Sequence, residues 1–351
     1  MIKAKIKIGI MTAWNSDSGV CMHAEPIVKE WLKMGFDVRV FSYLREDQHG
    51  LTTKEKDEPY VTRCFGTFDR SKFLNPRPIL KELYDYFIVE DLGTLPQENL
   101  LNIFPEIRKK SRKLIQIYHD AEPKPADSLF WKFQWDGVIC FDERQISPLK
   151  SIYPKIDLVP FPCYPIRHGN KILARLNLNL PLRKKIVLVF GQRGYQLLTP
   201  ETFFENFKEK NFLFLELVHH DNHASIERNR LFELRKGQTL TAKRFDQYLF
   251  AADMIILDKN HAARDKGVIS STAFQALGAF CPIIARDSAF FVPFKDEILK
   301  FTNEEELQRN ILRVSCDKKT RENLRRAATN FVKTHSPRII AAKLLENCKK
   351  N

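Results

Sequence analysis

The sequence predicts an α/β fold with two domains, each a parallel β-sheet covered by helices on both faces. Three observations lead to this prediction. The chain has 351 residues, and a globular domain usually takes about 100–200. Apolar segments typical of strands alternate with helical segments, which is the pattern of a covered parallel sheet. A proline cluster at Pro160–Pro165 interrupts the alternation, and the same pattern then starts again.

The first half opens with a β-α-β pattern. Residues 3–10 and 38–43 are apolar enough for two strands, and the segment between them has a helical apolar face that ends near Gly35. A polar turn at Thr12–Gly19 joins the first strand to this helix. Further strands are predicted at 86–90, 114–118, 137–141 and 156–160. Such a succession is typical of a Rossmann-like domain.

The second half repeats this organisation. Strands are predicted at 185–190, 212–217, 252–257 and 282–285, and terminal helices at 318–333 and 337–349. We therefore expect an N-terminal domain at 1–165, a C-terminal domain at 166–335, and a final helix at 336–351 that packs back on the first domain. Two such sheets that face a central cleft would hold an anionic, nucleotide-type ligand.

Composition narrows the class of protein. No run of about 18–20 apolar residues is present, and the N-terminus leads directly into a strand, so we expect a cytoplasmic protein. The seven cysteines form no Cys-x-x-Cys pair, which disfavours a disulfide framework or a zinc ribbon. The net charge of +14 suits phosphorylated ligands or an anionic membrane surface, but no nucleic-acid-binding module is recognisable.

Most of the positive charge is expected on solvated helical faces. The basic runs are Lys109, Lys110, Arg112, Lys113, Arg183, Lys184, Lys185, Lys318, Lys319, Arg321, Arg325 and Arg326.

Ligands of parallel sheets bind beyond the carboxyl ends of the strands, so the loops there contain the candidate site residues. In the first half these are Gly19, which allows close backbone approach, and His119 with Asp120. His119 could accept a proton or hold a hydroxyl, and Asp120 could orient it. Ordinary turn residues and a structural histidine explain the same pattern.

Two loops of the second half suit a phosphate. Arg193 lies between two glycines after a strand, and its planar guanidinium matches phosphate oxygens. Ser270, Ser271 and Thr272 open a short helix that ends at Gly278. Free N–H groups and hydroxyls at a helix start bind phosphate, and a simple N-cap explains only one of the three hydroxyls.

Together these segments resemble the GT-B-fold glycosyltransferases, most closely the retaining group called family 4. The stretch Gln275–Ala285 stands in the place of that family's Glu-Ala-Met-Ala-x-Gly-x-Pro-Val-Ile-Ala motif. The resemblance implies that Arg193 contacts the donor diphosphate, that Ser270, Ser271 and Thr272 hold its oxygens, and that Gln275 approaches the ribose. It places His119 beside the transferred sugar and the Gly19 loop near donor and acceptor.

The sequence departs from the family pattern in its donor motif. Two glutamates eight positions apart are usual there, and Gly267 and Gln275 occupy these positions. Asp265 could replace the first carboxylate. Phe280 and Cys281 replace a small glycine turn before Pro282.

The resemblance favours a hexosyltransferase that uses a nucleotide diphosphate sugar and needs no cofactor or metal. Its acceptor would be a glycan, a lipid-linked saccharide or a small molecule, and basic helices could hold it at an anionic membrane. A GT-B-like binding or scaffold protein without catalysis is the alternative that the altered motif favours. A nucleotide-dependent oxidoreductase is disfavoured, because no Gly-x-Gly-x-x-Gly follows the first strand.

Overall fold

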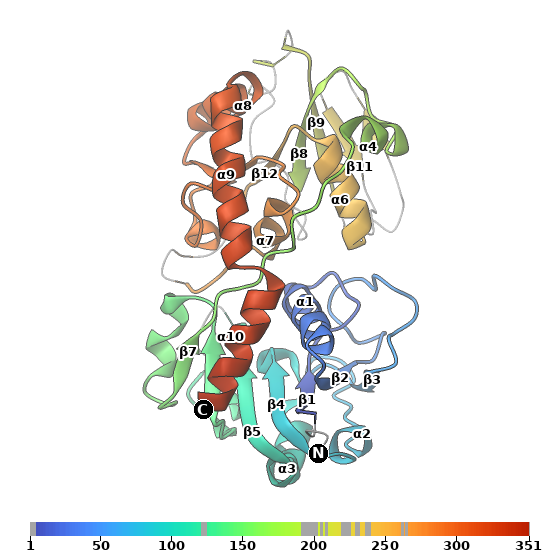
Figure 1. The fold of residues 1–351 in the computed structure, drawn as a ribbon, viewed down its shortest axis with the longest axis vertical. Helices are drawn as coiled ribbons and strands as arrows, with labels where there is room; N and C mark the ends of the chain where they lie inside the picture. Colours follow the sequence, from blue (N-terminus) through green and yellow to red (C-terminus); the bar gives the residue numbers. More distant parts are fainter. Residues whose placement is uncertain are drawn as a thin grey trace. The chain divides into compact units, whose positions relative to one another are not determined.

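A computed structural model of the chain describes residues 5–120, 125–190, 203, 206–207, 210–218, 226–228, 232–235, 240–260, 263 and 266–350. The chain divides into two compact units (Figure 1). Unit 1 contains Met1–Pro162, Asp265–Val268 and His335–Asn351, and unit 2 contains Cys163–Arg264 and Ile269–Thr334.

Unit 1 is built on a seven-stranded sheet in the order β3-β2-β1-β4-β5-β6-β7, in which every pair is parallel. The central strands are almost continuously apolar, because both faces of the sheet are covered. In chain order the strands are β1 (Lys7–Met11), β2 (Asp37–Tyr43), β3 (Val61–Phe65), β4 (Tyr84–Glu90), β5 (Ser111–Ile117), β6 (Gly137–Cys140) and β7 (Ile156–Leu158).

Helices α1 (Gly19–Lys33), α2 (Arg77–Leu80), α3 (Gln97–Lys110) and α10 (Pro337–Lys350) belong to unit 1. Helix α10, from the end of the chain, packs against α1, and Figure 1 shows the two side by side. Trp31 of α1 is fully buried, and its indole N–H donates to the carbonyl of Ala341, 3.0 Å away. The end of the chain thus completes the cover of the first sheet.

Unit 2 contains a second seven-stranded sheet, in the order β10-β11-β9-β8-β12-β13-β14. Only the β10–β11 pair is antiparallel among its described pairs. The strands are β8 (Lys185–Phe190), β9 (Phe212–Leu217), β10 (Ile226–Arg228), β11 (Phe232–Arg235), β12 (Met254–Leu257), β13 (Ile283–Arg286) and β14 (Leu299–Phe301).

Helices α4 (Lys171–Asn177), α6 (Ala242–Ala251), α7 (Ser271–Leu277), α8 (Glu304–Cys316) and α9 (Lys318–Thr334) belong to unit 2. Phenylalanines dominate its core: Phe207, Phe212 and Phe214 are buried and in mutual ring contact. No described helix has the length and apolar character that a membrane crossing requires.

The predicted α/β class with two Rossmann-like parallel sheets is confirmed. Every predicted strand is present within a few residues, but β3, β10, β11 and β14 were missed. They are edge strands or next to an edge, and they are short or interrupted by charged residues such as Arg63 and Lys300. The expectation that the basic runs lie on helices was wrong for Arg112 and Lys113 on β5 and for Lys185 on β8. It was also wrong for Arg183 and Lys184, which lie in the loop before β8.

Candidate active site

The carboxyl edge of the unit 1 sheet carries a buried polar cluster of His23, Glu90 and His119. Glu90 ends β4, His119 follows β5, and His23 lies on α1. The side chains of His23 and Glu90 are fully buried, whereas 9% of the His119 side chain is exposed. His119 is therefore the member of the cluster that a ligand can reach.

Glu90 is the hub of this cluster. His23 Nδ1 donates to Glu90 Oε1 over 2.9 Å, and the hydroxyl of Thr12 donates to Oε2 over 3.0 Å. His119 Nε2 lies 3.6 Å from Oε2. One carboxylate thus holds the His23 ring by a hydrogen bond and lies at ion-pair distance from the His119 ring.

The acid that the structure places beside His119 is Glu90, which sequence reasoning missed together with His23. Asp120, the predicted orienting acid, follows His119 in the chain, and its carbonyl accepts from Gln145 Nε2 over 3.3 Å. The signal that could have revealed Glu90 is a lone carboxylate at the end of the apolar run Tyr86–Glu90. A charge there needs partners, because an unpaired buried charge is costly.

Burial and pairing set the charges of the cluster. Burial lowers the pKa of His23, whose Nδ1 donates to Glu90. Burial also raises the pKa of Glu90, but attraction and hydrogen bonding by His23, together with His119, outweigh it and bring that pKa to about 2. Glu90 is therefore an ionised carboxylate within the protein interior.

Aromatic rings enclose the two histidines. The Phe141 ring centroid lies 4.7 Å from that of His119 and 4.8 Å from that of His23, and the Phe161 ring lies 5.4 Å from His23. These rings exclude water, and electrostatic interactions inside such an enclosure are stronger than in solvent.

The same three residues form the group whose ligand atoms, all within 4.8 Å of one another, could hold a metal among the described residues. Two imidazoles and one carboxylate are suitable ligands for several divalent metals. However, the Nδ1 atom of His23 that would face the metal already donates to Glu90. We therefore interpret the cluster as hydrogen-bonded rather than metal-binding.

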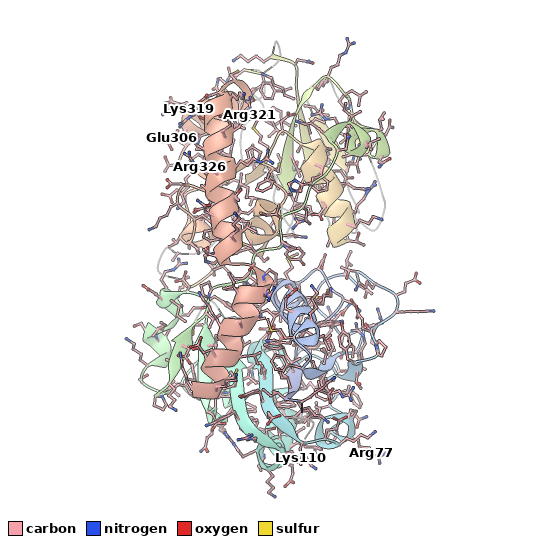
Figure 2. The ribbon with its side chains drawn as sticks, viewed as in Figure 1. Arg77, Lys110, Glu306, Lys319, Arg321 and Arg326 are labelled. Carbon is pink, nitrogen blue, oxygen red and sulfur yellow. The ribbon has the colours of Figure 1, made fainter. Side chains whose placement is uncertain are left out.

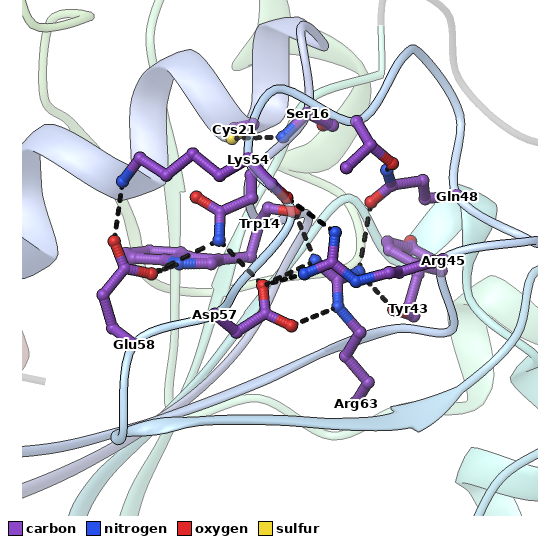
Figure 3. Close-up of polar contacts among 12 residues, drawn as sticks. Trp14, Ser16, Cys21, Tyr43, Arg45, Gln48, Lys54, Asp57, Glu58 and Arg63 are labelled. Carbon is purple, nitrogen blue, oxygen red and sulfur yellow. Dashed lines mark hydrogen bonds and ion pairs between the residues drawn. The ribbon is translucent and has the colours of Figure 1, made fainter.

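The loop between β1 and α1 is held from outside by a polar network (Figure 3). Trp14 Nε1 donates to Glu58 over 2.8 Å, and Asn15 Nδ2 donates to Asp57 over 2.7 Å. Arg63 Nη2 donates to the carbonyl of Trp14 and also pairs with Asp57. Asn15 has a φ of 50°, a left-handed conformation that asparagine tolerates. The network fixes the backbone of the loop ahead of Gly19.

Gly19 is the first residue of α1, and Ser18 caps the helix by accepting from the amide of Cys21 over 3.2 Å. The predicted Gly19 loop and the His119 turn therefore lie at the same edge of the sheet. His23, one turn further along α1, connects the helix to the Glu90 cluster.

The carboxyl edge of the unit 2 sheet contains the predicted donor helix, α7. Ser270 is its N-cap residue, Ser271 is its first residue, and Thr272 and Gln275 are buried within it. Thr272 Oγ1 is buried with no hydrogen-bond partner among the described residues. Of these four residues, Ser271 is the most exposed.

A cation at this edge was not predicted. Lys259 follows β12, and its Nζ lies 3.4 Å from the hydroxyl of Ser270. Next to it, Asp258 forms an ion pair with Arg286 at the end of β13.

The structure also explains the missing first glutamate. A Cβ atom added to Gly267 would lie 2.3 Å from Gln145 Cγ and 3.2 Å from the Gln145 amide nitrogen. Gln145 is itself buried and accepts from the amides of Phe141 and Asp142. No space is therefore left at Gly267 for a glutamate. Two other predicted site residues, Arg193 and Asp265, lie outside the described residues.

A hollow of about 330 Å³ lies in the loops that follow β3, β4 and β5 of unit 1. Its lining residues are Phe68, Lys72, Gly93, Pro96, Gln97, Glu98, Asn99, Ser128 and Leu129.

No family model matches the sequence. Solved structures do match over nearly its whole length. Sucrose-phosphate synthase from Thermosynechococcus elongatus aligns with a TM-score of 0.64 and 13% identity, covering 99% of both chains. An alpha-glucosyltransferase in complex with UDP aligns with a TM-score of 0.66 and 9% identity, covering 99% of this chain and 100% of its own.

Anabaena HepE in complex with UDP-glucose also gives a TM-score of 0.66, at 10% identity and with coverage of 99% and 100%. The chain has the fold of GT-B glycosyltransferases. At these identities the likeness establishes the fold and no more.

Proposed function

We propose that this protein is a glycosyltransferase that moves a hexose from a nucleotide diphosphate sugar to an acceptor hydroxyl, with retention of configuration. One observation carries the proposal: the fold match spans 99% of the chain, and the matched structures include complexes with UDP and UDP-glucose. The acceptor is proposed to be a glycan, a lipid-linked saccharide or a small molecule.

In this proposal the carboxyl edge of unit 2 binds the donor. The Nζ of Lys259 would contact phosphate oxygens, and the buried hydroxyl of Ser270, which accepts from Nζ over 3.4 Å, would position that cation. The half-buried Ser271 at the first position of α7 would add a hydroxyl and a backbone N–H. Arg193, on the family resemblance, would supply a guanidinium. Gln275 is buried, so its contribution would be to hold α7 in place rather than to contact the ribose directly.

The carboxyl edge of unit 1 would serve the transferred sugar and the acceptor. His119 would hold a sugar hydroxyl, and Glu90 would fix the orientation of its imidazole. The acceptor oxygen bonds to the anomeric carbon, the bond from that carbon to the diphosphate breaks, and the leaving phosphate oxygen takes the acceptor proton. Charge on the diphosphate is stabilised by Lys259 and hydrogen-bond donors, so no metal is required.

Donor binding is tested by a thermal-shift screen of UDP, GDP, ADP, CDP and NAD(P). A ligand that binds the native state raises the melting temperature by mass action. We expect one nucleoside diphosphate to stabilise the wild type and to lose most of its effect in Lys259→Ala. Lys319→Ala, an exposed lysine elsewhere in unit 2, is the control. Stabilisation by NAD(P) alone would contradict the proposal.

Turnover separates this proposal from the second candidate function, a GT-B-like binding protein without catalysis. Gly267 and Gln275, which replace the usual glutamates, favour that candidate. Slow hydrolysis of the cognate nucleotide sugar, or transfer to an acceptor, would support the enzyme. Nucleotide binding with no release of nucleoside diphosphate would support the binding protein.

Two finer parts of the proposal have their own tests. Activity that survives EDTA would agree with a metal-independent mechanism, and strict dependence on a divalent ion would refute it. Salt-sensitive sedimentation with acidic liposomes would support a lipid-linked acceptor reached at a membrane surface. Each basic residue near an anionic bilayer contributes about 1 kcal/mol to the free energy of membrane binding.

A further inference from the structure

Unit 2 contains a second candidate site, at the amino edge of its sheet. A cavity of about 700 Å³ opens beside Lys185, the first residue of β8, and beside Asp253 and Pro282, which precede β12 and β13. Lys259 and Ser270 lie at the carboxyl ends of the same sheet. The cavity is therefore separate from the proposed donor site.

Lysine and arginine dominate the charged lining of this cavity. The charged residues that line it are Arg167, Lys171, Lys185, Lys318, Arg321, Arg325, Asp253 and Glu322.

Both acids are already paired with cations. Asp253 bonds to Lys171 and Arg175, and Glu322 lies 3.6 Å from Lys318. The acids therefore do not neutralise the remaining cations of the cavity.

Three cations of the lining have no acidic partner among the described residues. Lys185 lies over the ring of Phe212, and Arg321 donates to the carbonyl of Val314 over 2.7 Å. Arg325 lies over the ring of Phe280, with 4.8 Å between the guanidinium carbon and the ring centroid. Cations without an acidic partner on a concave surface form a favourable environment for an anion.

Phe280 supports this arrangement at a cost to the backbone. Its φ is 58°, a left-handed conformation that bulky residues rarely adopt. The ring lies between Arg325 and His168, whose imidazole centroid is 5.9 Å away. A strained residue that holds a cation at a cavity is typical of a functional site.

We propose that this cavity binds a small soluble phosphorylated ligand with two or more negative charges. The volume suits a compound of sugar-phosphate or nucleotide size. Arg321 and Arg325 contact its phosphate oxygens from α9, Lys185 from β8, and Phe280 positions Arg325. A ligand in this cavity would bind at the amino ends of β8, β12 and β13, whereas the proposed donor site lies at the carboxyl ends of the sheet.

The test is calorimetric titration of the full-length protein with inorganic pyrophosphate, in the presence and absence of saturating UDP. Arg321→Gln and Arg325→Gln should each weaken binding about tenfold, because each removes charge-assisted contacts to phosphate. Arg326→Gln and Lys319→Gln are matched controls on the same helix. They lie outside the cavity lining, and Figure 2 shows them on the other side of α9 from Arg321.

Phe280→Asn tests the positioning role. Asparagine tolerates a positive φ, so the variant should keep its melting temperature while pyrophosphate binding weakens. Saturating UDP blocks the proposed donor site, so pyrophosphate binding to the wild type with UDP and to the Lys259→Ala variant should be the same. This distinguishes the cavity from the donor site and makes the result independent of the proposed function.

Several outcomes would overturn the proposal. They are no pyrophosphate binding, equal binding by the α9 variants and their controls, and loss of binding only in Lys259→Ala. Salt-sensitive binding to phosphatidic acid vesicles without pyrophosphate binding would equally reject a soluble ligand.

Discussion

Two buried glutamates, one in each sheet, have pKa values that are shifted in opposite directions. Glu90 ends β4 in unit 1, and Glu216 lies next to the end of β9 in unit 2. Glu90 is fully buried and Glu216 is 4% exposed, yet the pKa of Glu90 falls to about 2 whereas burial raises that of Glu216 to about 7. Similar burial is therefore accompanied by opposite pKa shifts.

The difference lies in their partners. Glu90 accepts hydrogen bonds from His23 and Thr12, while Glu216 Oε1 has no hydrogen-bond partner among the described residues. Burial disfavours a charge, and only donors or opposite charges reverse that preference. These donors keep Glu90 ionised at a strand end, and the proposed function gives this carboxylate the role of orienting His119.

The largest expected effect comes from removing the negative charge of Glu90. Glu90→Gln keeps the shape but removes the carboxylate, so His119 loses its fixed orientation. We expect kcat for sugar transfer to fall by about 10²-fold, the scale seen when a group that orients a functional imidazole is removed. KM for the donor should change little, because Lys259 and Ser270 are unaffected.

Steady-state kinetics across pH check this prediction, with Glu82→Gln as control. Glu82 is a partly exposed carboxylate paired with Lys7 and Arg39. An unchanged kcat and pH profile in Glu90→Gln would refute the positioning role.

Removing one donor from Glu90 should produce a smaller effect, on stability. Thr12→Val deletes the 3.0 Å hydrogen bond to Oε2 while preserving shape. A hydrogen bond to a charged group contributes about 1.5–3 kcal/mol, so we expect a loss of about 2 kcal/mol in the free energy of unfolding at pH 7. Urea denaturation measures it, with the exposed Thr62→Val as control.

The pKa of Glu90 determines how the stability lost in Thr12→Val depends on pH. The folded pKa of Glu90, about 2, is below its ordinary value of 4.5. The stabilisation is therefore fully present above pH 4.5 and is lost as the pH falls towards 2. The difference between wild type and Thr12→Val should shrink over that same range, and a constant difference would show that Thr12 acts through packing alone.

The sheets could be predicted from sequence because their central strands are apolar runs whose pattern is local. The candidate site was predictable only in part. His119 was found because it follows a strand, and Ser270 because it opens a short helix. Their neighbours Glu90 and Lys259 are set by the tertiary fold and could not be found in this way.

The same limit applies to charge and to backbone conformation. Arg321 and Arg325 were predicted to lie on a solvated helical face, since a sequence gives no sign that a cavity faces them. The positive φ of Phe280 is likewise invisible in sequence, because a bulky aromatic residue argues against it.

The smallest expected effect concerns Glu216, and it has the opposite sign. Its folded pKa is raised from 4.5 to about 7, so Glu216 is compatible with folding while protonated and costs stability as the pH rises through 7. Glu216→Gln stays neutral at every pH. We expect it to stabilise the protein by about 1 kcal/mol at pH 8. This is well below the free energy equivalent to the whole pKa shift, because a buried amide also requires hydrogen-bond partners.

At pH 5 the difference between wild type and Glu216→Gln should nearly vanish. Urea denaturation at both pH values measures it, and Glu233→Gln in the neighbouring β11 is the control. Glu233 is also buried but pairs with Arg235, so its substitution should destabilise at both pH values. If Glu216→Gln is instead destabilising at pH 8, the carboxylate has a partner there that compensates its burial, and the two glutamates are alike after all.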